Sequence, residues 1–114
     1  MKNKENISSG VTHNTLAVGT FVKGDVKAEE DFRIDGRLEG SIECSGRVII
    51  GQQAEVTGNI ECEDCDLYGR VDGNIILNGT VKLKSSSHLT GEIVAKYVEI
   101  EIGAFFAGSC KMIN

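Results

Sequence analysis

One short pattern recurs along most of this chain of 114 residues: an apolar residue, any residue, glycine, any residue, and a second apolar residue. It occurs six times, and its glycines are Gly24, Gly40, Gly58, Gly73, Gly91 and Gly108. Successive glycines lie 16, 18, 15, 18 and 17 residues apart, which is too regular for scattered loops and too short for a repeat that contains a helix. The spacing predicts a solenoid in which each period is one coil.

A second alternating segment lies between successive glycine patterns, for example Phe32-Arg33-Ile34 and Val81-Lys82-Leu83. Alternation with a period of two indicates strands with one face buried. A coil of about 17 residues holds three short strands and their corners. Right-handed connections between parallel strands dominate. The predicted fold class is therefore all-β: a single-domain, right-handed, three-sided parallel β-helix (solenoid) of about six coils.

When the coils are aligned on their glycines, inward and outward positions separate. The residues two and four places after glycine are apolar in every coil, whereas the residue one place after it is always polar. Glycine itself recurs because the wall must bend there, and only glycine takes a positive φ without steric cost. The alignment predicts that the following residues pack in the core: Val26, Ile42, Cys44, Ile60, Cys62, Ile75, Ile93, Phe106 and Cys110.

The N-terminal stretch shows neither period and is rich in Asn, Ser, Thr and Lys. It predicts a disordered tail over residues 1–19, a β-helix domain over 20–112 and a short C-terminal end at 113–114. The alternative use of the tail is membrane attachment through Met1, Ile7 and the two lysines. Such a short stretch without an amphipathic pattern buries little apolar area, so disorder is the favoured interpretation.

Charge and hydropathy exclude several classes of protein. The formal net charge is −5, and acidic and basic residues are interspersed, so no basic stripe indicates a nucleic-acid partner. The sequence has neither an apolar run long enough to span a membrane nor the apolar start of a signal peptide. A cytoplasmic location is expected, with the four cysteines as free thiols.

Cys62-Glu63-Asp64-Cys65 has the spacing of half a zinc site, but a second pair is lacking. Cys44, Cys62 and Cys110 fall in interior columns, where a free cysteine behaves as a small hydrophobe. Cys65 is the one cysteine expected to be exposed. The sequence therefore predicts no metal site.

Gly103 and Gly108 have the glycine spacing of a phosphate-binding loop. Ser109-Cys110 follows where that motif requires Lys and then Ser or Thr, and no strand-loop-helix unit is present to hold it. No nucleotide or other cofactor is expected.

Two enzyme classes also use stacked β-coils. A left-handed hexapeptide-repeat acyltransferase, or a related trimeric enzyme, is the alternative function, but a six-residue period is not sustained and only His13 and His88 could supply a wall histidine. Acidic residues such as Glu99 and Glu101 could suggest glycoside cleavage, but that requires a cleft lined with aromatic residues. The chain has only two Tyr and four Phe, so no enzyme activity and no catalytic residue are predicted.

The ends of the predicted solenoid point to self-assembly. The first and last coils expose unpaired backbone groups, and no capping element is evident beside them. The outward residue three places before each glycine is charged or polar in the middle coils and aromatic only at the ends, as Phe21 and Phe105. These two residues and Ile102 are predicted to form a polymerisation interface with other copies of the chain.

The run Phe32-Arg33-Ile34-Asp35-Gly36-Arg37-Leu38-Glu39-Gly40, preceded by Gly24-Asp25-Val26, resembles the bactofilins. The resemblance covers roughly Thr20 to Met112. It implies a right-handed, three-sided β-helix that forms non-polar filaments without nucleotide and serves as a scaffold for cell-shape or cell-envelope machinery.

The same resemblance implies cell-wall enzymes or membrane-associated proteins as further partners, and a location at the inner face of the cytoplasmic membrane. The Pro-rich tails of the family are missing here, because the chain has no Pro. Partner or membrane binding through the tail is therefore left open.

Overall fold

The computed structural model describes residues 13–113, and within them the chain forms strands and turns but no helix. Every pair of neighbouring strands is parallel. The strands form three ladders, which we call sides A, B and C.

Side A consists of β1 (His13–Leu16), β4 (Asp31–Ile34), β7 (Arg47–Ile50), β10 (Asp64–Leu67), β13 (Thr80–Leu83) and β15 (Tyr97–Ile100). Side B consists of β2 (Phe21–Lys23), β5 (Arg37–Glu39), β8 (Glu55–Thr57), β11 (Arg70–Asp72) and the first halves of β14 (His88–Ala95) and β16 (Phe105–Met112). Side C consists of β3 (Val26–Ala28), β6 (Ile42–Cys44), β9 (Ile60–Cys62), β12 (Ile75–Leu77) and the second halves of β14 and β16.

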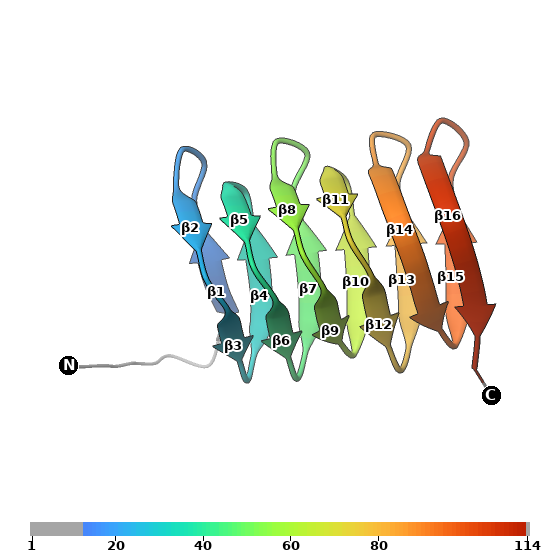
Figure 1. Ribbon diagram of the computed structural model, residues 1–114, viewed down its shortest axis with the longest axis horizontal. Coiled ribbons are helices and arrows are strands. Elements are labelled where there is room, and N and C mark those ends of the chain that lie inside the picture. The colour runs from blue at the N-terminus through green and yellow to red at the C-terminus, as the bar shows by residue number, and fades with distance from the viewer. Residues whose placement is uncertain (1–12, 114) are drawn as a thin grey trace.

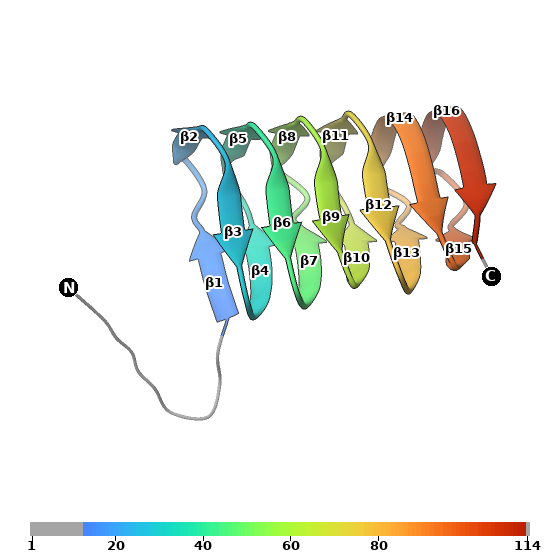
Figure 2. The ribbon, with the colours of Figure 1, turned by 60° about the horizontal axis from the view of Figure 1, so that its bottom comes forward.

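The chain follows side A, side B and side C in turn and repeats this path six times. In Figure 1 it runs up the back and down the front while it advances from left to right, so the coil is right-handed. Figure 2 shows the coils as successive turns of one stack, with β1 and β16 at opposite ends. The predicted architecture is confirmed, and its hand is opposite to that of the hexapeptide-repeat enzymes.

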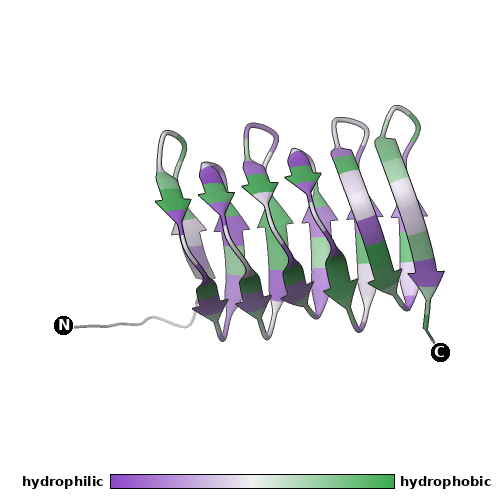
Figure 3. Ribbon diagram, in the orientation of Figure 1, coloured by the Kyte–Doolittle hydropathy of each residue, from purple (hydrophilic) through white to green (hydrophobic). Residues whose placement is uncertain are grey.

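Inward side chains stack directly on one another because the register is kept from coil to coil. On side A, for example, Ile34 pairs with Ile50 and Leu67 pairs with Leu83, and all four are fully buried. Figure 3 shows the resulting alternation of hydrophobic and hydrophilic residues along the strands. Each such large side chain contributes about 1.5–3 kcal/mol on removal from water. Packing of these side chains in the interior of the stack, which we call the lumen, therefore stabilises the coils.

The six glycines of the repeat form a column at the corner between sides B and C. All have φ between +139° and +149°, a region that favours glycine. A Cβ atom on Gly40, Gly58, Gly73, Gly91 or Gly108 would also overlap the backbone carbonyl oxygen of the glycine in the preceding coil. Glycine is therefore required there for both its backbone conformation and the close contact between coils.

The uneven glycine spacing comes from two other corners. The loop between sides A and B has two residues in the coils of β4 and β10 but four in the other coils, which Figure 1 shows as taller loops. The corner between sides C and A has two residues except before β10 and β15, where it has one. These changes leave the strand register unchanged.

Polar residues at the corners accept hydrogen bonds from the next coil. Asp31 Oδ1 accepts from the Arg47 backbone N–H at 2.9 Å, and Asp64 Oδ1 accepts from the Thr80 N–H at 2.9 Å. In the polar column after glycine, Asp25 accepts in the same way from the Ser41 N–H at 3.0 Å. These side chains pair backbone groups that the turns leave without a ladder partner.

The sequence predicts a disordered tail through residue 19, and this boundary is too late. His13–Leu16 forms β1, which pairs with β4 along its whole length. The strand has no glycine pattern before it, and its polar Asn14 opposes Phe32 in the register, so the apolar period does not reveal it. Residues 1–12 and 114 lie outside the described part of the chain.

Two cysteines differ from their predicted environments. Cys65 is fully buried rather than exposed, because the corner before β10 is one residue shorter and turns Cys65 inward between Val48 and Val81. Cys110 is exposed rather than in the core, although it opposes the buried Ile93 in the register. It faces the lumen in the last coil, where no further coil of this chain covers it.

The other residues predicted to pack in the core lie in the interior columns. Those of the inner coils are buried, namely Ile42, Cys44, Ile60, Cys62, Ile75 and Ile93. Val26 in the first coil and Phe106 in the last are only half-buried and pack against the core from its two ends.

Candidate functional site

The N-terminal end of the stack consists of β1, β2 and β3, each of which pairs with another described strand along one edge only. Phe21, in β2, is 53% exposed on the outer surface of side B. The Arg37 guanidinium lies 5.1 Å from the centre of its ring, a cation–π contact that fixes one face of the aromatic. Val18, in the loop before β2, is exposed beside it.

The C-terminal end consists of β15 and β16, whose outer edges are also free of any described strand. Phe105 begins β16 and stacks on His88 of the preceding coil, with ring centres 4.2 Å apart and an interplanar angle of 14°. It remains 48% exposed. Ile102, in the loop before β16, is 98% exposed.

Two further apolar side chains at this end belong to interior columns. Ile100 opposes the buried Leu83, and Met112 opposes the buried Ala95, yet both are about half exposed because no described coil covers them. The half-buried Phe106 opposes Leu89 in the same way. The end of the lumen is therefore an open apolar surface.

The three residues predicted for the interface lie at the two ends, Phe21 at one and Ile102 and Phe105 at the other. Phe21 and Phe105 are the first and last members of one outward column on side B, whose middle members are Arg37, Glu55, Arg70 and His88. Arg37 and Glu55 form an ion pair at 3.8 Å in this column. Phenylalanine stands in this column only in the first and last coils, and charged or polar residues stand between them.

Val18, Ile100 and Met112 also belong to these ends, although sequence reasoning did not select them. The sequence does carry a signal for Val18 and Ile102, because each is the second residue of a four-residue loop between sides A and B. The same position holds the polar residues Gln52 and Ser85 in inner coils, so apolar residues occur there only at the two ends.

The thiols of the central coils lie in the lumen. Burial raises the pKa of Cys44, whose Sγ also donates a hydrogen bond to the Glu30 carbonyl oxygen at 3.1 Å. A hydrogen bond with Cys62, together with burial, raises the pKa of Cys65 well above its ordinary value. These side chains are therefore protonated near neutral pH and act as apolar packing groups.

Other functional features were sought in residues 13–113. No group of three or more potential metal-ligating residues is present among them. No helix in that part of the chain is long and apolar enough to cross a membrane. His88 is half-buried against Phe105.

The comparisons with known proteins agree with this geometry. The bactofilin family model, described as polymer-forming cytoskeletal, matches residues 14–111. A solved structure of the Thermus thermophilus bactofilin in double helical filaments superposes with a TM-score of 0.79 and 27% sequence identity, covering 85% of this chain and 96% of that one. No curated protein sequence matches the chain significantly.

Proposed function

Because the chain belongs to the bactofilin family of polymer-forming cytoskeletal proteins, we propose that its copies join end to end into filaments through the surfaces of the first and last coils. One observation carries this proposal. Within residues 13–113, nine large hydrophobic residues are exposed, and seven of them lie in the first or last coil: Val18, Phe21, Tyr97, Ile100, Ile102, Phe105 and Met112. Such a distribution is unfavourable for a monomer in water and favourable for a contact surface.

Backbone hydrogen bonding adds to this attraction. The long strand β16 pairs with β14 along one edge, and its other edge presents N–H and C=O groups to which no described strand binds. Another copy of the chain can bind there and cover the open end of the lumen at the same time.

Assembly of this kind needs no nucleotide, since backbone pairing and apolar burial supply the attraction. The filament would serve in the cytoplasm as a scaffold for cell-shape or cell-envelope machinery, including at the inner face of the cytoplasmic membrane. The double helical filaments of the Thermus thermophilus relative support a polymeric form. The structural role of the family favours a function without catalysis.

The test is assembly of the purified chain without nucleotide or metal, followed by electron microscopy and light scattering. Phe105→Arg should leave the β-sheet circular dichroism spectrum unchanged and shorten filaments to monomers or dimers, because it places a charge in the apolar end. Filaments of Phe105→Arg equal in length to wild type would contradict the proposed contact, as would a wild-type protein that stays monomeric.

Thr57→Arg is the matched control. Thr57 is exposed on side B in the middle of the stack, between Glu39 and Asp72 in the register, so an arginine there has two carboxylates nearby. It should leave the filaments intact. Glu55 is less suitable, because an arginine there would lie between Arg37 and Arg70.

A further inference from the structure

Two thiols in the lumen lie on either side of one corner between sides C and A. Cys62 ends β9, Cys65 lies in β10, and both side chains are buried. The corner between these strands is the single residue Glu63. In the preceding coil the corner has two residues, and an inward residue follows Cys44 only after four positions, at Val48. The shorter corner therefore places an inward thiol at each of its ends.

The thiols of Cys62 and Cys65 are in direct contact. They share a hydrogen bond, which together with burial raises the pKa of Cys65 well above its ordinary value. The thiol of Cys44 is engaged elsewhere, because its Sγ donates to the Glu30 carbonyl oxygen at 3.1 Å and accepts from the Gly46 backbone N–H at 3.4 Å. Among the cysteines of residues 13–113, Cys62 and Cys65 are thus the pair placed to react with each other.

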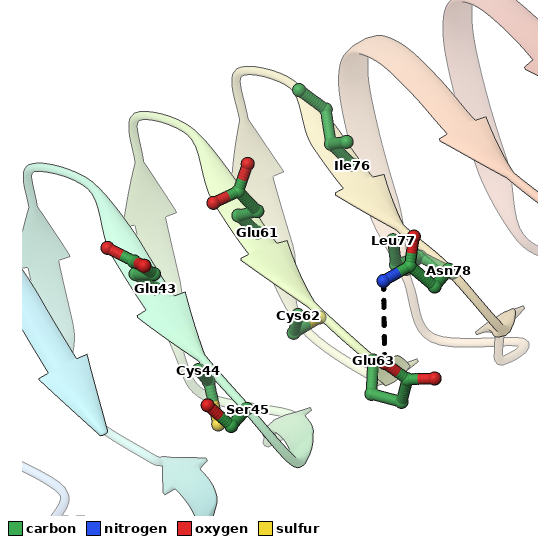
Figure 4. A pocket seen from close by; sticks show the side chains of 9 residues that line it. All are labelled: Glu43, Cys44, Ser45, Glu61, Cys62, Glu63, Ile76, Leu77 and Asn78. Atoms are coloured by element: carbon green, nitrogen blue, oxygen red, sulfur yellow. Dashed lines mark hydrogen bonds between the residues drawn. The ribbon is translucent and has the colours of Figure 1, made fainter. Parts of the chain in front are cut away.

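A shallow depression of about 340 Å³ on side C leads to one of these thiols. Figure 4 shows Cys62 among the residues that line it, together with Glu43, Glu61 and Glu63. Cys62 is 5% exposed, whereas Cys65 is fully buried. A small molecule in the depression therefore meets Cys62 first, with Cys65 behind it.

The carboxylates around the depression restrict which molecules can enter. No cationic group of residues 13–113 lies within 4.0 Å of Glu43, Glu61 or Glu63. Glu63 accepts a hydrogen bond from the neutral Asn78 Nδ2 at 3.5 Å. The uncompensated negative charge repels anionic oxidants such as oxidised glutathione. Hydrogen peroxide is small and neutral, so it can enter.

We propose that Cys62 and Cys65 form a reversible oxidation site, at which hydrogen peroxide converts the two thiols into a disulfide across the corner. The Cys62 sulfur attacks one peroxide oxygen, the O–O bond breaks, and the second oxygen leaves as water with the thiol proton. Cys62 is then a sulfenic acid. The Cys65 sulfur attacks the Cys62 sulfur, the S–O bond breaks, and the hydroxide leaves as water with the Cys65 proton. Two thiols and one peroxide thus give one disulfide and two waters.

The rate of this oxidation should depend on pH. The thiolate is the form that attacks, and thiols are mostly protonated at neutral pH. The reaction should therefore be slow at pH 7 and faster at higher pH. The site would respond to sustained oxidising conditions, and a dithiol reductant should reverse it by thiol–disulfide exchange.

The disulfide should leave the rest of the fold in place. Cys62 opposes Leu77 in the register, and Cys65 lies between Val48 and Val81. The new bond joins positions three residues apart within one turn of the chain, so no ladder has to change its register. The oxidation does not depend on end-to-end assembly, and filament length should be the same before and after it.

The test treats the purified full chain with hydrogen peroxide and maps disulfides by mass spectrometry after the remaining thiols are blocked. Wild type should lose two of its four thiols, with Cys62 linked to Cys65 and an unchanged circular dichroism spectrum. Dithiothreitol should restore both thiols. Wild type that keeps all four thiols, or a different pairing, would overturn the inference.

Two variants test the roles of the thiols. Cys65→Ala leaves Cys62 without a second thiol, so peroxide should produce a sulfenic acid at Cys62 that dimedone labels. Cys44→Ala is the matched control, since it removes the thiol of the same column one coil away, and it should still form the disulfide. Loss of the disulfide in folded Cys44→Ala would contradict the assigned pair, as would an unlabelled Cys62 in Cys65→Ala.

The route of access is tested with charged disulfides that share one chemistry. Cystamine is cationic and oxidised glutathione is anionic, so cystamine should oxidise the pair at least about tenfold faster. Glu61→Gln should reduce this ratio. Equal rates with the two reagents would show that the oxidant does not enter through the acidic depression.

A distant destabilising variant separates oxidation of the folded chain from oxidation after unfolding. Gly24→Ala lies in the first coil, where the glycine has φ of +139°, and it changes no residue of the depression. Its oxidation rate should equal that of wild type. A rate that rises in proportion to the unfolded fraction would mean that the pair reacts only in the unfolded chain, and the proposed site would not exist.

Discussion

At the scale of single residues, the position of a side chain within the stack decides its environment as much as its chemistry does. Cys65 and Cys110 are the same residue type, and both point toward the lumen. Cys65 has coils on both sides and is fully buried, whereas Cys110 lies in the last coil and is exposed. Their replacement should therefore have different consequences.

Cys65→Ser is expected to lower the free energy of unfolding by about 1–3 kcal/mol, because the serine hydroxyl would leave water for the apolar lumen without a hydrogen-bond partner there. Cys110→Ser should change it by less than about 0.5 kcal/mol. Urea unfolding followed by circular dichroism measures both. Equal effects of the two changes would show that Cys65 is not in a closed lumen.

Alkaline pH should destabilise the fold through the same thiol. The pKa of Cys65 is raised in the folded chain, by its hydrogen bond with Cys62 and by burial, and that of Cys44 is raised by burial. Below the pKa of the unfolded chain both states hold the proton, so the contribution to stability is complete. Above about pH 9 the unfolded state ionises first, and this contribution is lost as pH rises.

The measurement is the urea midpoint of wild type and Cys65→Ala between about pH 8 and pH 10. The decline should be shallower in the variant, with the remainder due to Cys44 and other groups. Identical slopes would mean that Cys65 does not titrate differently in the folded and unfolded states.

At the scale of strands and corners, the glycine column sets the distance between coils. Gly24 and Gly58 have the same φ, +139°, but a different neighbourhood. A Cβ on Gly58 would overlap the Gly40 carbonyl oxygen, whereas a Cβ on Gly24 would meet nothing within 4 Å. Alanine substitutions at these two glycines therefore separate the cost of backbone strain from the cost of the close contact between coils.

Gly24→Ala should cost about 1–3 kcal/mol from backbone strain alone. Gly58→Ala adds a steric overlap with backbone that cannot move without opening the ladder, so it should destabilise the fold by clearly more. Thermal unfolding of both variants tests this difference. Equal losses would show that the contact between coils is not tight.

The sequence was sufficient to predict the coils because each coil carries glycine and apolar residues at equivalent positions. The glycine pattern identified the corner between sides B and C, and the apolar columns identified the lumen. It could not place Cys65, because an inward residue follows Cys44 after four positions at Val48 but follows Cys62 after three. It missed β1 because Asn14 and Thr15 carry no apolar period.

The candidate ends were predictable only in part, for a related reason. Columns show which way a side chain points, so Phe21 and Phe105 were found as outward aromatics. The columns do not show whether a further coil covers the side chain. Cys110 was therefore assigned to the core although it lies in the last coil. Ile100 and Met112 likewise look like core residues in the alignment and differ from them only by their place in the last coil.

At the scale of the whole molecule, the two ends are different surfaces, with β16 forming one long continuous strand and β2 and β3 forming two short ones. The family resemblance implies non-polar filaments, in which each end meets its own kind. Phe21→Arg or Phe105→Arg alone should then stop assembly at dimers, and the double variant should be monomeric. Monomers from either single variant, measured by light scattering, would indicate that unlike ends meet.

The loops between sides A and B show that this wall accepts extra residues without losing its register, since coils with two and with four loop residues occur in one stack. Gln52 and Gln53 lie exposed at the tip of such a loop in the third coil. A peptide tag inserted between them would project from the same position, the third coil, of every subunit. A polymer built from the tagged chain would then carry the tags at regular intervals, set by the repeat of subunits along it.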